Sequence, residues 1–175
     1  MRKLIILKTI LDFLFIMLML GSVLIILLMG TILFSGDGMA EIPIKISLLD
    51  ESIEKWTTGL SIVLVFGIIA YVLFVYAIYQ LKTIVRLFMK TTLFHDSIIK
   101  GFRHIGSCFV LISFFIYVPK LIYRVFGPPH EFKLMFGGDF FNSFWFILSM
   151  GLFFMVLGNI FKIAKHAKEE NELTV

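Results

Sequence analysis

The segment KTTLFHDSIIKGFRHIG, Lys90 to Gly106, gathers side chains that could support chemistry or recognition. Its seventeen positions hold two histidines, one aspartate and three basic residues. Such a segment could supply an acid–base pair, a nucleic-acid-binding patch, or the connection between two membrane helices. The sequence on either side decides between these alternatives.

The best nucleophile and base that the sequence offers are Ser61 and His104. The predicted topology places Ser61 near the outer end of the second span and His104 near the inner end of the third, too far apart for the hydrogen bond this chemistry requires. The four histidines show no HExxH or comparable ligand spacing, and the single Cys108 cannot form an intramolecular disulfide. We therefore expect no enzymatic activity, no metal site and no cofactor.

Composition and apolar run length indicate a membrane protein. Hydrophobic residues make up 59% of the 175 positions, and the mean hydropathy is +0.99. Crossing ~30 Å of hydrocarbon takes about 20 helical residues, and Phe13–Phe34, Gly59–Tyr79 and Phe140–Phe161 each provide such a run without a charge. A fourth run, between Arg103 and Lys120, has only sixteen residues without a formal charge. We count it as a span whose flanking basic side chains reach the head groups or face protein.

These runs predict an all-α membrane protein, a single domain built as a four-transmembrane-helix bundle. The spans are expected at about 12–34, 59–80, 102–123 and 140–162. Apolar residues alternate in EIPIKISL of the first loop and in HEFKLMF of the third. This alternation is typical of strands, so the two loops could pair as a small extracytoplasmic β-cap, with two irregular loops as the alternative.

The distribution of basic residues predicts the orientation, because Lys and Arg near short loops stay on the cytoplasmic side. Eleven basic residues flank the N-terminus, the middle loop and the C-terminus, against five on the other side. Both termini and the middle loop should therefore be cytoplasmic, in a bacterial cytoplasmic membrane. The net charge of +4 then follows from topology, and we expect no direct nucleic-acid binding.

The middle loop is predicted to continue the second helix and to begin the third. Lys82, Arg86 and Lys90 recur every four residues and so share one helix face, while Ile84 and its apolar neighbours occupy another. Such a basic stripe lies against anionic lipid head groups or, alternatively, a partner protein. Asp96 is expected to be the N-cap of the third helix.

Asp12 is a carboxylate close to the inner end of the first span, where an unpaired charge is costly. We expect it to pair with Arg103 or His104 at the inner end of the third helix. The alternative is that it reaches water or pairs with Lys8, four residues earlier.

The C-terminal tail carries Glu169, Glu170 and Glu172 just after the fourth span. The helix dipole disfavours negative charge at a helix C-terminus, so these residues gain little from continuing the helix. We expect the tail to lie against the basic middle loop as a weak electrostatic clamp, and its removal to strengthen the capture of any partner bound there. A solvated tail is the alternative.

The four spans, the segment LFHDSIIKGFRHIG and the ending AKHAKEENELTV together resemble the bacterial membrane family called domain of unknown function 2975. The matching positions of the segment are Phe94, Arg103, Ile105 and Gly106. The acidic ending, Glu169 to Val175, also matches. Leu93 departs from the pattern, which has a Gly-Pro-like turn at that position.

Members of that family often accompany a small helix-turn-helix regulator, so the resemblance implies a membrane partner of a small DNA-binding regulator and no known chemistry. The alternative function is a small transporter or channel component, which should place polar groups at mid-bilayer facing a cavity. The spans supply few such groups. The oligomeric state is not indicated by the sequence.

Overall fold

The computed structural model describes residues 2–34, 58–90, 95–126 and 138–173. It contains the helices α1 (Arg2–Phe34), α2 (Thr58–Met89), α3 (Asp96–Phe126) and α4 (Gly138–Leu173). All four are long and apolar enough to cross a membrane, and the described residues include no strand. The predicted all-α membrane protein with four transmembrane helices is therefore confirmed. The two loops expected to form a β-cap lie outside the described residues.

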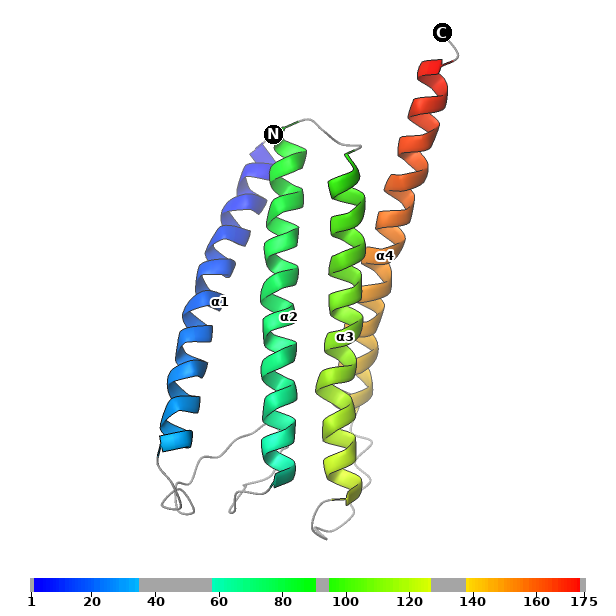
Figure 1. Ribbon diagram of the computed structural model, residues 1–175. Helices are drawn as coiled ribbons and strands as arrows, with labels where there is room; N and C mark the ends of the chain where they lie inside the picture. The colour runs from blue at the N-terminus through cyan, green and yellow to red at the C-terminus, as the bar shows by residue number, and fades with distance from the viewer. Residues whose placement is uncertain (1, 35–57, 91–94, 127–137, 174–175) are drawn as a thin grey trace.

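The helices are longer than the apolar runs that predicted them. α1 begins at Arg2, α2 continues to Met89 and α4 to Leu173. The 36 residues of α4 extend about 54 Å at 1.5 Å per residue, which exceeds the ~30 Å of hydrocarbon. The C-terminal part of α4 projects beyond the ends of the other helices (Figure 1).

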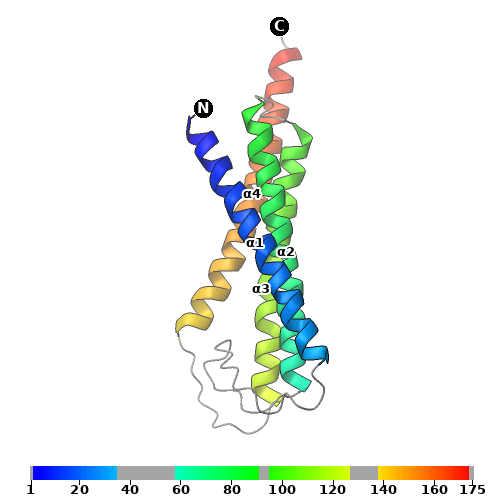
Figure 2. The same ribbon diagram turned by 90° about the vertical axis from the view of Figure 1, so that its left-hand side faces the viewer.

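The four helices lie in chain order, each beside the next (Figure 1). Within the described residues, backbones come close only between chain neighbours: α1 with α2, α2 with α3, and α3 with α4. Figure 2 shows α1 and α4 running obliquely, with opposite tilts, relative to α2 and α3. Both termini lie at the end of the molecule where α2 ends and α3 begins (Figures 1 and 2).

The core lies between α2, α3 and α4, toward the end that carries the termini. Its buried residues are Ala77, Ile84, Ile98, Phe102, Ile105 and Cys108. The Phe102 ring stacks on Phe161 of α4 at a centroid distance of 5.3 Å and on Phe154 at 6.2 Å. Phe88 of α2 also contacts both Phe102 and Phe161, so aromatic side chains join all three helices.

Two glycines allow a close approach of α3 and α4. A Cβ atom at position 106 would lie 2.6 Å from the carbonyl oxygen of Gly151, and one at position 151 would lie 2.9 Å from that of Gly106. A methyl group on either helix would therefore force the backbones apart. Small residues at such contacts are typical of membrane helices, because they permit close van der Waals packing where hydrophobic burial gives no advantage over lipid.

The contact between α1 and α2 is of a different kind. The Tyr71 hydroxyl of α2 donates a hydrogen bond to the backbone carbonyl of Leu18 on α1. Gly21 leaves room for it, since a Cβ there would lie 2.7 Å from the Tyr71 oxygen. Leu11 is the buried apolar residue of α1 in the described part, and most other large side chains of this helix are exposed.

Candidate functional site

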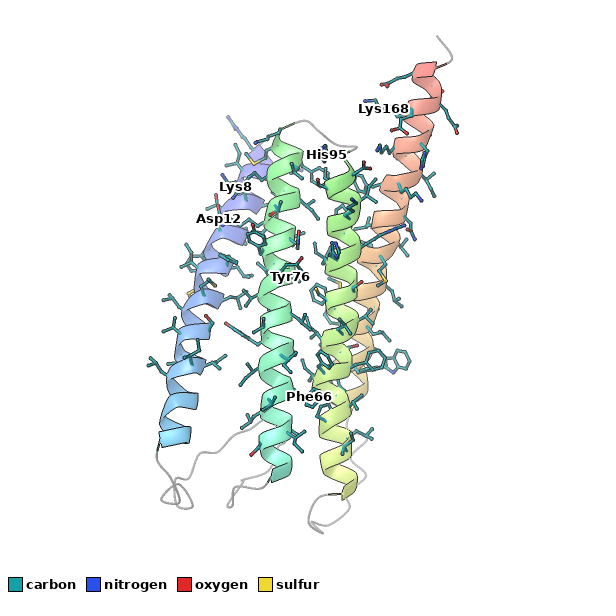
Figure 3. All side chains as sticks on the ribbon, viewed as in Figure 1. Lys8, Asp12, Phe66, Tyr76, His95 and Lys168 are labelled. Carbon is teal, nitrogen blue, oxygen red and sulfur yellow. The ribbon has the colours of Figure 1, made fainter. Side chains whose placement is uncertain are left out.

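The candidate functional site is the end of the molecule that carries both termini, which we call the charged end. It comprises the first turns of α1 and α3 and the last turns of α2 and α4 (Figure 1). Figure 3 shows Lys8, Asp12, His95 and Lys168 in this half of the structure. The sequence singled out most of these residues, but several of their contacts differ from the expected ones.

Asp12 pairs with Lys82, so the expected pairing with Arg103 or His104 is wrong. The Lys82 Nζ lies 2.7 Å from the Asp12 Oδ1 and 4.9 Å from the centroid of the Phe15 ring. The physical reason is helix order: within the described residues the backbone of α1 comes close to α2, not to α3. The ion pair and the cation–π contact together fix the register of α1 against α2.

The basic stripe on α2 is present as predicted. Arg86 and Lys90 are exposed, whereas Ile84 and Val85 are buried against the core. The innermost member of the stripe, Lys82, is partly buried by its contacts with α1. The stripe therefore continues outward from an ion pair.

The beginning of α3 is capped by His95, not by Asp96 as expected. The backbone N–H of Ser97 donates to the His95 Nδ1 at 3.2 Å, and that of Ile98 donates to the His95 carbonyl at 2.9 Å. Asp96 is the first helical residue, where negative charge is favourable. Its carboxylate is left to accept a hydrogen bond from the Lys165 ammonium of α4, at 2.8 Å.

Arg103 and Gly106 both contact α4. The Arg103 guanidinium donates to the side-chain oxygen of Asn159 at 2.8 Å, and Gly106 makes the close contact with Gly151. His104, between them, is exposed. Phe94, which was singled out by the family resemblance, lies outside the described residues.

The acidic residues at the end of α4 are helical and pair within their own helix. Glu169 lies 3.5 Å from Lys165 and 3.7 Å from His166, and Glu172 lies 3.5 Å from Lys168. Ala, Lys, Glu and Leu in this stretch favour helix, which offsets the unfavourable dipole. The expected clamp of Glu169 and Glu172 against the middle loop is not the arrangement seen, although Glu170 lies on the same exposed turn.

Lys165 and Asn159 are site residues that the sequence did not single out. Lys165 forms ion pairs with both Asp96 of α3 and Glu169 of α4. The side-chain oxygen of Asn159 accepts a hydrogen bond from Arg103. The spacing of Lys165 and Glu169 was a visible signal for a pair within the helix. The contacts to α3 had no local signal.

Electrostatic recognition is the chemistry that this end can perform. Exposed cations lie on α2, α3 and α4, with carboxylates beside them on α3 and α4. No three His, Cys, Asp or Glu side chains in the described part of the chain converge as metal ligands. Ser61 lies in the first turn of α2, at the opposite end from His95, while His104 is two to three turns into α3. The two are thus held apart, as the topology predicted.

No curated protein and no solved structure matches the chain. A family model matches residues 45–175, a segment that contains α2, α3 and α4 and their contacts with one another, but not α1. The chain is therefore a member of the family described as Protein of unknown function (DUF2975).

Proposed function

We propose that this integral membrane protein acts by interaction, as the membrane partner of a small helix-turn-helix transcription regulator, with the charged end in the cytoplasm. The excess of Lys and Arg at that end supports the orientation, because basic flanks are retained in the cytoplasm. The membrane is then a bacterial cytoplasmic membrane. The complex would hold the regulator at the membrane surface. Whether the regulator reaches its DNA would then depend on whether it is bound to the membrane protein.

The observation that carries the proposal is the projection of α4 beyond the other helices (Figure 1). Residues 166–172 are all exposed, and they continue a helix whose base is fixed to α3 by the Lys165–Asp96 ion pair. A helical segment of mixed charge outside the hydrocarbon has no role in spanning the bilayer. It offers a partner both polar contacts and electrostatic steering.

The interior offers less to a transported substrate. The buried polar side chain in the described part is Ser113, and its hydroxyl donates to the Val110 carbonyl of its own helix at 2.7 Å. Polar groups of a transport pathway are expected to face a shared cavity near mid-bilayer. Among the side chains that the structure describes, the charged groups gather at the charged end, which favours interaction over transport.

Copurification from detergent tests the proposal. The protein would be coexpressed with a helix-turn-helix protein encoded beside its gene, and we expect the two to elute together at moderate salt and to separate at high salt. Truncation after Lys165 should keep the Asp96 ion pair and membrane insertion but lose most of the bound regulator. This expectation replaces the gain of capture predicted from a tail clamp, because Glu169 and Glu172 pair within α4.

Lys100→Gln provides a matched control, since it changes an exposed charge on α3 without shortening α4. We expect this variant to retain more of the regulator than the truncated chain. Absence of copurification from the full chain would contradict the regulatory role. If the truncated chain captured as much regulator as the full chain, the projecting end of α4 would not be the surface that binds it.

A further inference from the structure

We propose that Lys8 and Arg86, at the outer end of the α1–α2 contact, form a binding site for the head group of an anionic phospholipid. The residues of this site, Lys8, Asp12, Lys82 and Arg86, are called the α1–α2 seam. The ligand of this site is an anion that carries a phosphate group attached to acyl chains. The inference concerns a lipid ligand and does not depend on the proposed protein partner.

Helix periodicity places the two cations on the two sides of the α1–α2 contact. α1 and α2 run in opposite directions, and the contact between Asp12 and Lys82 fixes their register. Lys8 is four residues before Asp12 and Arg86 is four residues after Lys82, so each lies one turn farther toward the charged end on the same side of its helix. Figure 3 shows Lys8 above Asp12 on α1.

The charges of the seam do not balance. Asp12 is the one carboxylate of the four residues, and it is already in contact with Lys82. Within the described parts of the chain, no carboxylate lies at ion-pair distance from Lys8 or Arg86. The seam thus presents two positive charges on neighbouring helices, and an anion between them would relieve their repulsion.

The depth of the seam selects a lipid as the anion. The charge-free runs begin at Phe13 on α1 and end at Tyr79 on α2, so the seam starts where both helices leave the hydrocarbon. Below it, Phe13 and Tyr79 keep 66% and 52% of their surface exposed. A phospholipid can place its phosphate between Lys8 and Arg86 and its acyl chains along these apolar side chains, whereas free phosphate gains only the first contact.

Native mass spectrometry of the full chain in detergent tests the site. The probes are phosphatidylglycerol and phosphatidylcholine with the same acyl chains, and inorganic phosphate at the same concentration. We expect the first phosphatidylglycerol to bind more tightly than phosphatidylcholine. The double variant Lys8→Gln, Arg86→Gln should weaken it by about five- to thirtyfold, since each basic residue near a membrane surface attracts anionic lipid modestly.

Two further variants make the result specific. Lys100→Gln with Lys162→Gln removes the same charge from exposed positions on α3 and α4, and it should leave the affinity within about twofold of the original. Lys8→Arg with Arg86→Lys should retain binding, because the charges are kept. Equal affinity for the two lipids, an equal loss in the α3–α4 control, or displacement of the lipid by equimolar phosphate would each overturn the proposal.

Discussion

The contact between α3 and α4 and the contact between α1 and α2 hold helices together in different ways. α3 and α4 meet through Gly106 and Gly151, with Phe102 stacked on the rings of α4. α1 and α2 are joined by a hydrogen bond from Tyr71 and an ion pair from Lys82. In lipid, apolar surface alone gives little reason for helices to associate. Close packing supplies that reason for the first pair, and polar contacts supply it for the second.

The helices also differ in how many neighbouring helices they contact. α3 packs between α2 and α4, and its aromatic contacts reach both. α1 has only α2 beside it in the described residues, and it precedes the segment matched by the family model. We therefore expect changes at the α3–α4 contact to affect the whole fold, and changes at the α1–α2 contact to affect mainly the position of α1.

The largest effect is expected from Gly106→Leu. The new side chain would overlap the backbone of Gly151 and the Met155 side chain, so α3 and α4 must separate. We expect a loss of about 3 kcal/mol in the free energy of unfolding, at the upper part of the usual range for overpacking. Reversible unfolding in mixed micelles measures it, with helix content followed by circular dichroism.

Gly67→Leu is the matched control for that measurement. A Cβ at position 67 meets nothing within 4 Å, so the leucine should extend into lipid without loss of stability. Equal destabilisation by the two substitutions would show that the close contact of Gly106 and Gly151 does not hold α3 to α4.

A smaller and more local effect is expected from Asp12→Asn. The neutral amide cannot form the ion pair with Lys82, and the positive seam then has no carboxylate to hold it together. Spin labels on exposed Ile6 of α1 and Met89 of α2, in a Cys108→Ser background, should report a longer and broader distance distribution.

Labels on Ser107 of α3 and Ile160 of α4 should report no change in the same variant. Ser22→Ala serves as the control on α1, because the Ser22 hydroxyl donates only within its helix, to the Met19 carbonyl, among the described contacts. An α1–α2 distance that Asp12→Asn leaves unaltered would mean that the ion pair does not position α1.

The sequence predicted the helices well because the physical requirement is simple. A charge-free run of about 20 residues is visible without any knowledge of neighbours. The sixteen-residue run after Arg103 was also correctly counted as a span, since Arg103 finds a polar partner in Asn159. The basic stripe on α2 followed from four-residue spacing alone.

The neighbours of each helix could not be predicted in the same way. α1 is apolar on every side, so its sequence does not indicate which face meets protein, and Asp12 was assigned to α3 instead of α2. His95 was not expected as a cap because histidine is outside the usual cap residues. Gly151 and Gly158 are seven residues apart and lie on one face of α4, and this spacing of small residues is a signal for close helix packing that can be seen in the sequence.

Cysteine labelling in intact cells tests the central claim, that the charged end lies in the cytoplasm and is available to a partner there. Single cysteines would replace Asp50 and Lys90 in a Cys108→Ser background and be treated with a membrane-impermeant maleimide. We expect the cysteine at position 50 to react from outside, and the one at position 90 to react only after the membrane is opened. Labelling of position 90 from outside, with position 50 protected, would contradict it.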